Sequence, residues 1–240
     1  MSNKLALVFG GSRGIGAACV QTLAASGFDV ACTYVTSAPN LLEQIGTSRT
    51  KAYAVDICVP TQVAQVFADV ARDFGRAPDC VVANAGINVP PGPVAQFNPE
   101  DFRKLVEVNI VGAFNILREA AQRVADGGSI IALTTSLVRH AAPNFGPYSA
   151  TKAAVECLVR AMAKELAPRR VRVNAVAPGP VDTDLFRAGK TEEAKQRAAA
   201  MSPFNRIGTP PEIAEVVNFL ASDKASWVHG QIVQPNGGLI

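Results

Sequence analysis

The sequence predicts an α/β protein with a single doubly wound parallel sheet of about seven strands and helices on both faces. Continuous apolar runs of valine, isoleucine, leucine and alanine alternate with amphipathic stretches from one end of the chain to the other. Strands of this composition are buried on both sides, as they are in parallel sheets. The 240 residues, 48% of them hydrophobic, suit one domain that spans residues 1–240.

The predicted strands are the short apolar runs, and the predicted helices are the stretches with apolar residues at helical spacing. Strands are expected at residues 4–9, 28–35, 51–55, 79–83, 129–134, 171–176 and 231–233. Helices are expected at residues 14–26, 60–74, 99–124 and 148–166, with a last one from Pro210 or Pro211 after the cap candidate Thr209.

Residues 182–206 form the one irregular region, between a predicted strand and the last predicted helix. The segment is charged and rich in alanine, and it has helical propensity. A mobile lid over a substrate suits these properties better than a second domain does.

Composition argues against several other classes of function. The net charge is only +3, and we interpret the one basic run, residues 169–172, as a solvated helix end rather than a nucleic-acid site. The five cysteines and two histidines lack the spacing of metal ligands, and we expect the cysteines to be reduced core residues. No apolar run approaches the roughly 20 residues that span a bilayer. Residues 1–4 lack the layout of a signal peptide, so we expect a cytoplasmic protein.

A glycine-rich turn joins the first predicted strand to the first predicted helix. Its glycines allow a tight turn and a close approach to a pyrophosphate, which the free amides at the helix N-terminus then bind. In an alternating β/α chain, this position indicates a Rossmann-type dinucleotide site. The residues expected to contact the cofactor are Gly10, Ser12, Arg13, Gly14, Ile15 and Gly16.

The end of the second predicted strand distinguishes NADP from NAD. NAD sites usually carry an acidic residue there for the ribose hydroxyls, and residues 32–37 contain no acid. The hydroxyls of this region, which includes Tyr34 and Ser37, and the nearby guanidinium of Arg13 suit a 2′-phosphate instead. We therefore expect NADP(H) as the cofactor, with NAD(H) as the alternative.

Tyr148 and Lys152 are four residues apart in a predicted helix and therefore share one helical face. A lysine beside a tyrosine favours the phenolate and lowers the phenol pKa, which is ordinarily about 10. A phenol shifted in this way passes a proton to or from an alcohol oxygen. The spacing alone is usually accidental, but together with the glycine loop it indicates a reductase.

These motifs together resemble the short-chain dehydrogenase/reductase family, in its 3-oxoacyl-reductase-like branch, over residues 5–238. The glycine loop matches the family pattern TGxxxGxG, with Phe9 where threonine is usual. Asp56 and Ile57 match a pair that family members place against the adenine. Further matches are a turn at Asn84, Ala85 and Gly86, and a nicotinamide loop with Pro178, Gly179, Val181 and Thr183.

The resemblance also implies a proton-relay set formed by Asn109, a hydroxyl, Tyr148 and Lys152. The family's asparagine breaks a long helix and holds a water near the lysine, and the lysine also holds the nicotinamide ribose. Family members usually carry a serine 13 residues before the tyrosine, where this chain has Thr135. We choose the next residue, Ser136, because serine is the usual residue type, and we keep Thr135 as the alternative.

The resulting prediction is an NADPH-dependent oxidoreductase that reduces a ketone, aldehyde or 3-oxoacyl group to an alcohol. A catalytically silent NAD(P)-binding regulator and an NAD-dependent alcohol dehydrogenase are the alternatives. An enoyl reductase of the same fold is disfavoured, because those enzymes usually space the tyrosine and lysine further apart. We expect a largely apolar substrate held by residues 88–93, residues 139–145 and the lid. The resemblance also implies a homotetramer.

Overall fold

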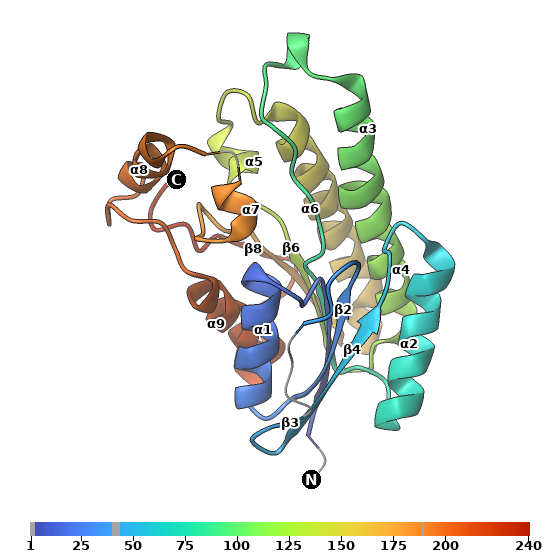
Figure 1. Cartoon of the computed structure of the whole chain (residues 1–240). Helices are drawn as coiled ribbons and strands as arrows, with labels where there is room; N and C mark the ends of the chain where they lie inside the picture. The colour runs from blue at the N-terminus through green and yellow to red at the C-terminus, as the bar shows by residue number, and fades with distance from the viewer. Residues whose placement is uncertain (1–2, 40–43, 189) are drawn as a thin grey trace.

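The computed structural model describes residues 3–39, 44–188 and 190–240. Residue 189, which belongs to the predicted lid, lies outside these described residues. One sheet with the strand order β3-β4-β2-β1-β5-β6-β7-β8 runs through the described chain. Helices cover both of its faces (Figure 1), so the predicted α/β architecture is confirmed.

The strands form a parallel sheet with one short antiparallel edge. They are β1 (Leu5–Phe9), β2 (Asp29–Tyr34), β3 (Gln44–Ile45), β4 (Ser48–Ala54), β5 (Cys80–Ala83), β6 (Ser129–Leu133), β7 (Arg172–Val176) and β8 (Ile232–Val233). All seven predicted strands are present. The hairpin partner β3 was not predicted, because two residues are too short to form an apolar run.

The helices follow the predicted pattern, with additional short helices after β6 and in the lid. They are α1 (Gly14–Ala25), α2 (Pro60–Phe74), α3 (Pro99–Val106), α4 (Ala113–Arg123), α5 (Leu137–His140), α6 (Gly146–Leu166), α7 (Asp184–Arg187), α8 (Glu192–Ala200) and α9 (Pro210–Ala221). Thr209 caps α9 as predicted, in a capping box with Glu212. Short 3₁₀ segments are η1 (Val94–Gln96), η3 (Ala167–Arg169) and η4 (Asp223–Ala225).

The helix predicted over residues 99–124 contains a π-helical turn, η2 (Glu107–Gly112), between α3 and α4. Such turns widen the helix locally and are frequent at functional sites. Asn109 lies within this turn, where its side chain bonds to backbone outside the helix. The break in the long helix that the resemblance implied at Asn109 therefore takes the form of a π-turn.

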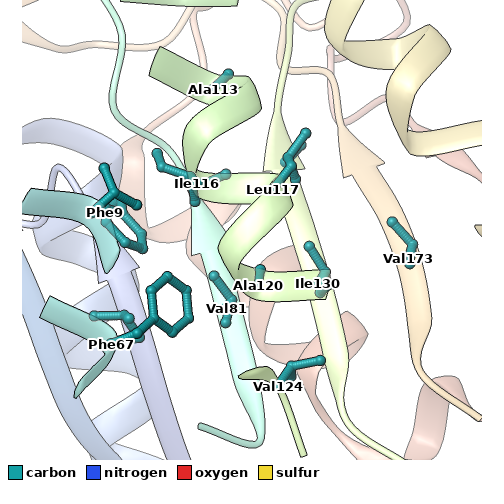
Figure 2. Packing of buried hydrophobic residues seen from close by; sticks show 14 of the residues in the cluster. Phe9, Phe67, Val81, Ala113, Ile116, Leu117, Ala120, Val124, Ile130 and Val173 are labelled. Carbon is teal, nitrogen blue, oxygen red and sulfur yellow. The ribbon is translucent and has the colours of Figure 1, made fainter. Parts of the chain in front are cut away.

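Strand β1 is buried on both faces, and its side chains alternate between two core clusters. Leu5, Leu7 and Phe9 face the layer of α2, α4 and α6, whereas Ala6 and Val8 face α1 and α9. In Figure 2 the ring of Phe9 lies near that of Phe67, with ring centroids 5.8 Å apart. Burying each such side chain stabilises the fold by roughly 1.5–3 kcal/mol. The core thereby holds the carboxyl end of β1, where the glycine loop starts.

The basic run at residues 169–172 has a structural role that differs from the expected solvated helix end. The Arg169 guanidinium donates to the carbonyls of Ala121 and Val124, at the end of α4. Arg172 donates to the carbonyl of Leu220, 2.6 Å away, at the end of α9. The two arginines therefore satisfy the last carbonyls of two helices that cover opposite faces of the sheet.

The expectation that all five cysteines lie in the core was wrong for two of them. Cys19, Cys32 and Cys80 are buried, but Cys58 is half-buried and Cys157 is exposed on α6. Helical spacing alone did not show that Cys157 lies on an outward face. All five are free thiols. Within residues 3–39, 44–188 and 190–240, no cluster of histidine, cysteine or acidic residues forms a metal site, and no helix is long and apolar enough to cross a bilayer.

Candidate functional site

The predicted site residues gather at the carboxyl end of the sheet. The glycine loop follows β1, Asn84 follows β5, Ser136 comes soon after β6, and Pro178 soon after β7. Because these strands are parallel and adjacent, their carboxyl ends lie along one edge. The sheet order runs in opposite directions on the two sides of β1, and doubly wound sheets bind ligands in the crevice at such a point.

The glycine loop is held tightly between two neighbouring strands. Gly10 has a φ of +74°, and a Cβ added at Gly16 would lie 2.0 Å from the Gly10 carbonyl oxygen, so no larger residue fits there. Asn84 Nδ2 donates to that same oxygen over 2.9 Å. The Gly10 amide donates to Thr33 Oγ1 over 3.1 Å. The glycine loop is therefore closely packed against β2 and the residue that follows β5.

Helix α1 presents an N-terminus suited to an anion. Arg13 is its N-cap residue in extended conformation, no side chain caps the helix, and the first turn contains no acid. Its first amides therefore lack intrahelical partners and are available to a phosphate. The Arg13 side chain is exposed, as is Ser37 beyond β2, while Tyr34 at the strand end is half-buried. Arg13, Tyr34 and Ser37 stay the predicted contacts for a 2′-phosphate.

The pair predicted to contact the adenine divides between surface and core. Asp56 is half-buried, and its Oδ1 accepts from the Cys58 amide over 2.9 Å. Ile57 is only 4% exposed and packs against Gly112, where an added Cβ would lie 2.7 Å from it. The Ile57 carbonyl also accepts from Asn115 Nδ2, 2.9 Å away. Asp56 is therefore the more accessible member of the pair.

Tyr148 and Lys152 lie in the first turns of α6, which begins with Pro147 in its first turn. Lys152 is 6% exposed, and its Nζ donates to the Leu133 carbonyl over 3.0 Å. Burial lowers the pKa of Lys152 to about 8 and raises the pKa of Tyr148 to about 12. The expected lowering of the Tyr148 pKa by Lys152 is therefore wrong, since burial disfavours the charged form of both side chains.

The polar ends of the Asn109 and Lys152 side chains converge beside Gly86. A Cβ added at Gly86 would lie 3.1 Å from Asn109 Oδ1 and 3.3 Å from Lys152 Nζ. Asn109 also pairs with the backbone of Ile87, accepting from its amide over 2.8 Å and donating to its carbonyl over 2.9 Å. The π-turn, the Asn84–Gly86 turn and helix α6 thus meet at one place.

Both candidate hydroxyls after β6 are buried. Ser136 Oγ donates to the Ala177 carbonyl over 2.7 Å, and the Ser136 amide donates to the Pro178 carbonyl over 2.9 Å. Thr135 Oγ1 accepts from the Leu137 amide over 3.3 Å. Ser136 is therefore bound at two points to the predicted nicotinamide loop, whereas the Thr135 hydroxyl bonds locally. The choice of Ser136 as the catalytic hydroxyl stays a prediction.

The predicted nicotinamide loop lies over the glycine loop. The Thr183 methyl carbon lies 3.3 Å from the position of a Cβ added at Gly14. Thr183 also caps α7, its Oγ1 accepting from the Phe186 amide over 3.1 Å. Pro178 and Val181 are buried, and the Gly179 amide donates to the Pro235 carbonyl over 3.2 Å. A cofactor on the glycine loop would therefore meet this second loop.

The lid consists of α7, α8 and the segment that leads to α9, and it exposes several apolar side chains. Leu185 and Met201 are exposed, and Phe204 is 70% exposed. Arg187, at the end of α7, pairs with Asp182 over 2.6 Å. A cavity of about 150 Å³ lies where the lid meets the C-terminal segment, and Ser202, Phe204 and Asn236 are among the residues that line it.

Sequence reasoning missed one buried polar residue in this region, Asn236. Its side chain reaches Ser136, although the two residues lie 100 positions apart. The signal available in the sequence was an asparagine followed by two glycines, which predicts a turn. That pattern does not show which part of the sheet edge the asparagine side chain faces.

Comparisons with known proteins find reductases and a dehydrogenase that match nearly the whole chain. A family model described as enoyl-(acyl carrier protein) reductase matches residues 10–240. An NADPH-dependent aldehyde reductase-like protein, chloroplastic, of Arabidopsis thaliana is 39% identical over 100% of this chain and 95% of its own. Versicolorin reductase 1 of Aspergillus parasiticus is 39% identical over 99% and 97%. A solved short chain dehydrogenase from Burkholderia cenocepacia J2315, in complex with NADP, matches with a TM-score of 0.87 and 31% identity over 98% and 97%.

Proposed function

Because this chain belongs to the short-chain dehydrogenase/reductase family, we propose that it reduces an aldehyde or a ketone to an alcohol with NADPH. The observation that carries this proposal is the convergence of Asn109, from η2, and Lys152, from α6, beside Gly86. Tyr148 lies one turn before Lys152 on the same face of α6. Such a set of side chains delivers protons to a carbonyl oxygen and has no evident use in a purely structural turn.

The cofactor is NADP(H), and the residues present fit it. The cradle at Gly10, Gly14 and Gly16 would be filled by any Cβ, and the N-terminus of α1 is open to a pyrophosphate. Arg13 and the hydroxyls of Tyr34 and Ser37 would hold the 2′-phosphate. Asp56 would meet the adenine, and Thr183 the nicotinamide carboxamide. The bound cofactor supplies a hydride from its nicotinamide ring.

The chain's own contribution is to move a proton and to stabilise developing charge. Tyr148 gives its phenolic proton to the substrate oxygen, and its raised pKa keeps this proton in place at neutral pH. Ser136 turns its hydroxyl proton from the Ala177 carbonyl to the same oxygen. Lys152 provides positive charge one helical turn from Tyr148 and a contact for the nicotinamide ribose. Asn109 supports a water that replaces the proton.

Three other functions receive less support. A silent cofactor-binding regulator would need neither the buried Lys152 nor its convergence with Asn109 beside Gly86. An enoyl reductase would fit the description of the matching family model, but the four-residue spacing of Tyr148 and Lys152 disfavours it. An NAD-dependent alcohol dehydrogenase would use the same relay, and the absence of an acid at the end of β2 disfavours that cofactor.

We also propose a homotetramer and a cytoplasmic location. An apolar depression on the outer face of η2, α4 and α6 supports association with a second copy; it is lined by Ile110, Val111, Phe114, Ala154, Cys157 and Leu158. Five free thiols support a reducing compartment. Light scattering tests the first proposal, and a monomer would contradict it. Cell fractionation tests the second, and recovery in an organelle would contradict it.

The decisive experiment is a screen of aldehydes, ketones and 3-oxoacyl thioesters that follows the absorbance of the reduced nicotinamide. We expect turnover with at least one class and a higher kcat/KM with NADPH than with NADH. Equal values with both cofactors would refute the cofactor preference. Tight NADPH binding without turnover on any carbonyl would favour the regulator, and reduction of an enoyl thioester alone would favour the enoyl reductase.

A further inference from the structure

The C-terminal segment, residues 235–238, places one polar side chain against the proposed catalytic hydroxyl. Asn236 Nδ2 lies 3.3 Å from Ser136 Oγ. Asn236 is 9% exposed and Ser136 is 1% exposed, so water competes little for this hydrogen bond. A buried contact between polar groups strengthens in such surroundings and is costly to leave unmade.

The orientation of the Asn236 amide follows from its second contact. The Gly238 amide donates to Asn236 Oδ1 over 3.0 Å, so the oxygen faces Gly238 and the nitrogen faces Ser136. The Ser136 hydroxyl proton goes to the Ala177 carbonyl, 2.7 Å away. Ser136 Oγ therefore accepts a hydrogen bond from Asn236 while it donates one elsewhere.

We propose that Asn236 is a positioning residue that acts on the reduction through Ser136. This inference rests on the function proposed above. Asn236 binds the oxygen of the hydroxyl and leaves its proton free to rotate from the Ala177 carbonyl to a substrate oxygen. A donor directed at a hydroxyl oxygen also polarises the O–H bond, which makes the hydroxyl a better donor in turn.

Two neighbours of Asn236 hold its segment in place. Ser202, buried at the end of the lid, donates from Oγ to the Gly237 carbonyl over 2.6 Å. The Pro235 carbonyl accepts from the Gly179 amide over 3.2 Å. Figure 1 shows the C-terminal end of the chain beside α8 of the lid. The backbone on either side of Asn236 is therefore bonded to the lid and to the nicotinamide loop, and a shift of either would move the Asn236 side chain relative to Ser136.

The substitution Asn236→Asp separates the two contacts of this side chain. A carboxylate keeps the acceptor for the Gly238 amide and the volume of the residue. It loses the donor and instead accepts the Ser136 proton. Loss of a donor that contacts the reacting oxygen typically lowers kcat by about 10²- to 10³-fold; for a donor one hydrogen bond further away we expect about tenfold. NADPH affinity and Tm should stay near the wild-type values.

The pH dependence of the variant provides a readout that a structural role would not move. When the pH falls and the new carboxyl takes up a proton, it regains a donor, so the kcat of Asn236→Asp should recover relative to wild type. Asn236→Ala should show a similar loss without this recovery. The alanine variant also keeps the test informative if the aspartate variant folds poorly.

Asn218→Asp is the matched control. Asn218 Nδ2 donates to Ser26 Oγ over 2.9 Å at an exposed position, so the same chemical change occurs outside the site. We expect its kcat and pH profile to equal those of the wild-type enzyme.

The double variant Ser136→Ala/Asn236→Asp tests whether Asn236 acts through Ser136. Its kcat is measured with the best carbonyl substrate of the wild-type screen. If Asn236 acts through Ser136, Asn236→Asp lowers kcat by less than about twofold in the Ser136→Ala background. An equal loss in both backgrounds would overturn the positioning role, while the wild-type activity would still support the reductase function. An inactive wild-type enzyme would refute the reductase function and the positioning role with it.

Discussion

The helices that carry the proton relay and the lid that faces them differ in how firmly the fold holds their side chains. Lys152 and Asn109 are buried, and both bond to backbone groups of neighbouring segments. In the lid, Leu185 and Phe204 are exposed, and the ion pair between Arg187 and Asp182 is open to solvent. One region is fixed by the core, and the other is held mainly at its ends.

This difference indicates a division of labour. Groups that transfer a proton must be held within a fraction of an ångström, which requires rigid elements and buried hydrogen bonds. Groups that select a substrate can lie on exposed segments, whose sequence varies at little cost to the fold. We therefore expect changes in the relay to reduce kcat and changes in the lid to alter KM.

The largest effect should come from Tyr148→Phe, which removes the proton donor and leaves the ring in place. General acid catalysis of this kind contributes about 10²- to 10⁴-fold, so kcat should fall by that factor. NADPH affinity, measured by fluorescence titration, should change little. Tyr53→Phe, which removes a phenol bonded to Asp73 away from the site, is the control and should keep full activity. Turnover at the wild-type rate in Tyr148→Phe would contradict the assignment.

A smaller loss, about 10²-fold in kcat, is expected for Ser136→Ala, because the hydroxyl stabilises charge on the substrate oxygen. Thr135→Ala should stay within about threefold of the wild-type rate, since the Thr135 hydroxyl bonds only to the Leu137 amide. Steady-state kinetics of the two variants under identical conditions makes the comparison. The reverse pattern would move the role to Thr135.

The pH profile of reduction should report Lys152. Its pKa is lowered to about 8, whereas the raised pKa of Tyr148, about 12, keeps the phenol protonated well above that pH. We therefore expect kcat/KM to decline by about tenfold per pH unit above pH 8 as the ammonium loses its charge. Lys152→Arg, which stays charged, should lose this decline even if its activity is lower. If kcat/KM of Lys152→Arg declines above pH 8 as it does in the wild-type enzyme, the titrating group is not Lys152.

The contribution of Lys152 to the stability of the fold should rise with pH over the range in which the activity falls. The pKa of Lys152 is lower in the folded state than its usual 10.5, so below pH 8 folding carries the full cost of a buried ammonium. Between pH 8 and 10.5 the folded state releases the proton first, and the contribution of Lys152 to the free energy of unfolding rises. Activity and this contribution to stability therefore move in opposite directions.

The smallest effect is expected in the lid. Phe204→Ala removes an exposed ring, so the loss of about 1 to 1.4 kcal/mol of apolar contact with substrate should raise KM by roughly five- to tenfold. Its kcat should stay within about twofold of the wild-type value. Phe102→Ala, on α3, removes another exposed ring and serves as the control. A tenfold loss of kcat in Phe204→Ala would show that the lid also governs the chemical step.

Sequence reasoning performed best where the determinants are local. The strands at residues 4–9 and 171–176 could be predicted because continuous apolar runs are characteristic of strands buried on both faces. Tyr148 and Lys152 could be paired because helix geometry alone places residues four apart on one face. The glycine loop could be recognised because its position between a strand and a helix is itself part of the pattern.

Only the tertiary structure decided how these residues are surrounded. It turned the pKa of Tyr148 upward, because desolvation depends on what packs around the phenol. It buried Ile57 against Gly112, and it brought Asn236 to Ser136 across 100 positions of sequence. Contacts between distant segments and the loss of water around a side chain arise only when the whole sheet is assembled. The chain's order of elements and its reactive pair were therefore set by local sequence, and the electrostatics and support of that pair were set by packing.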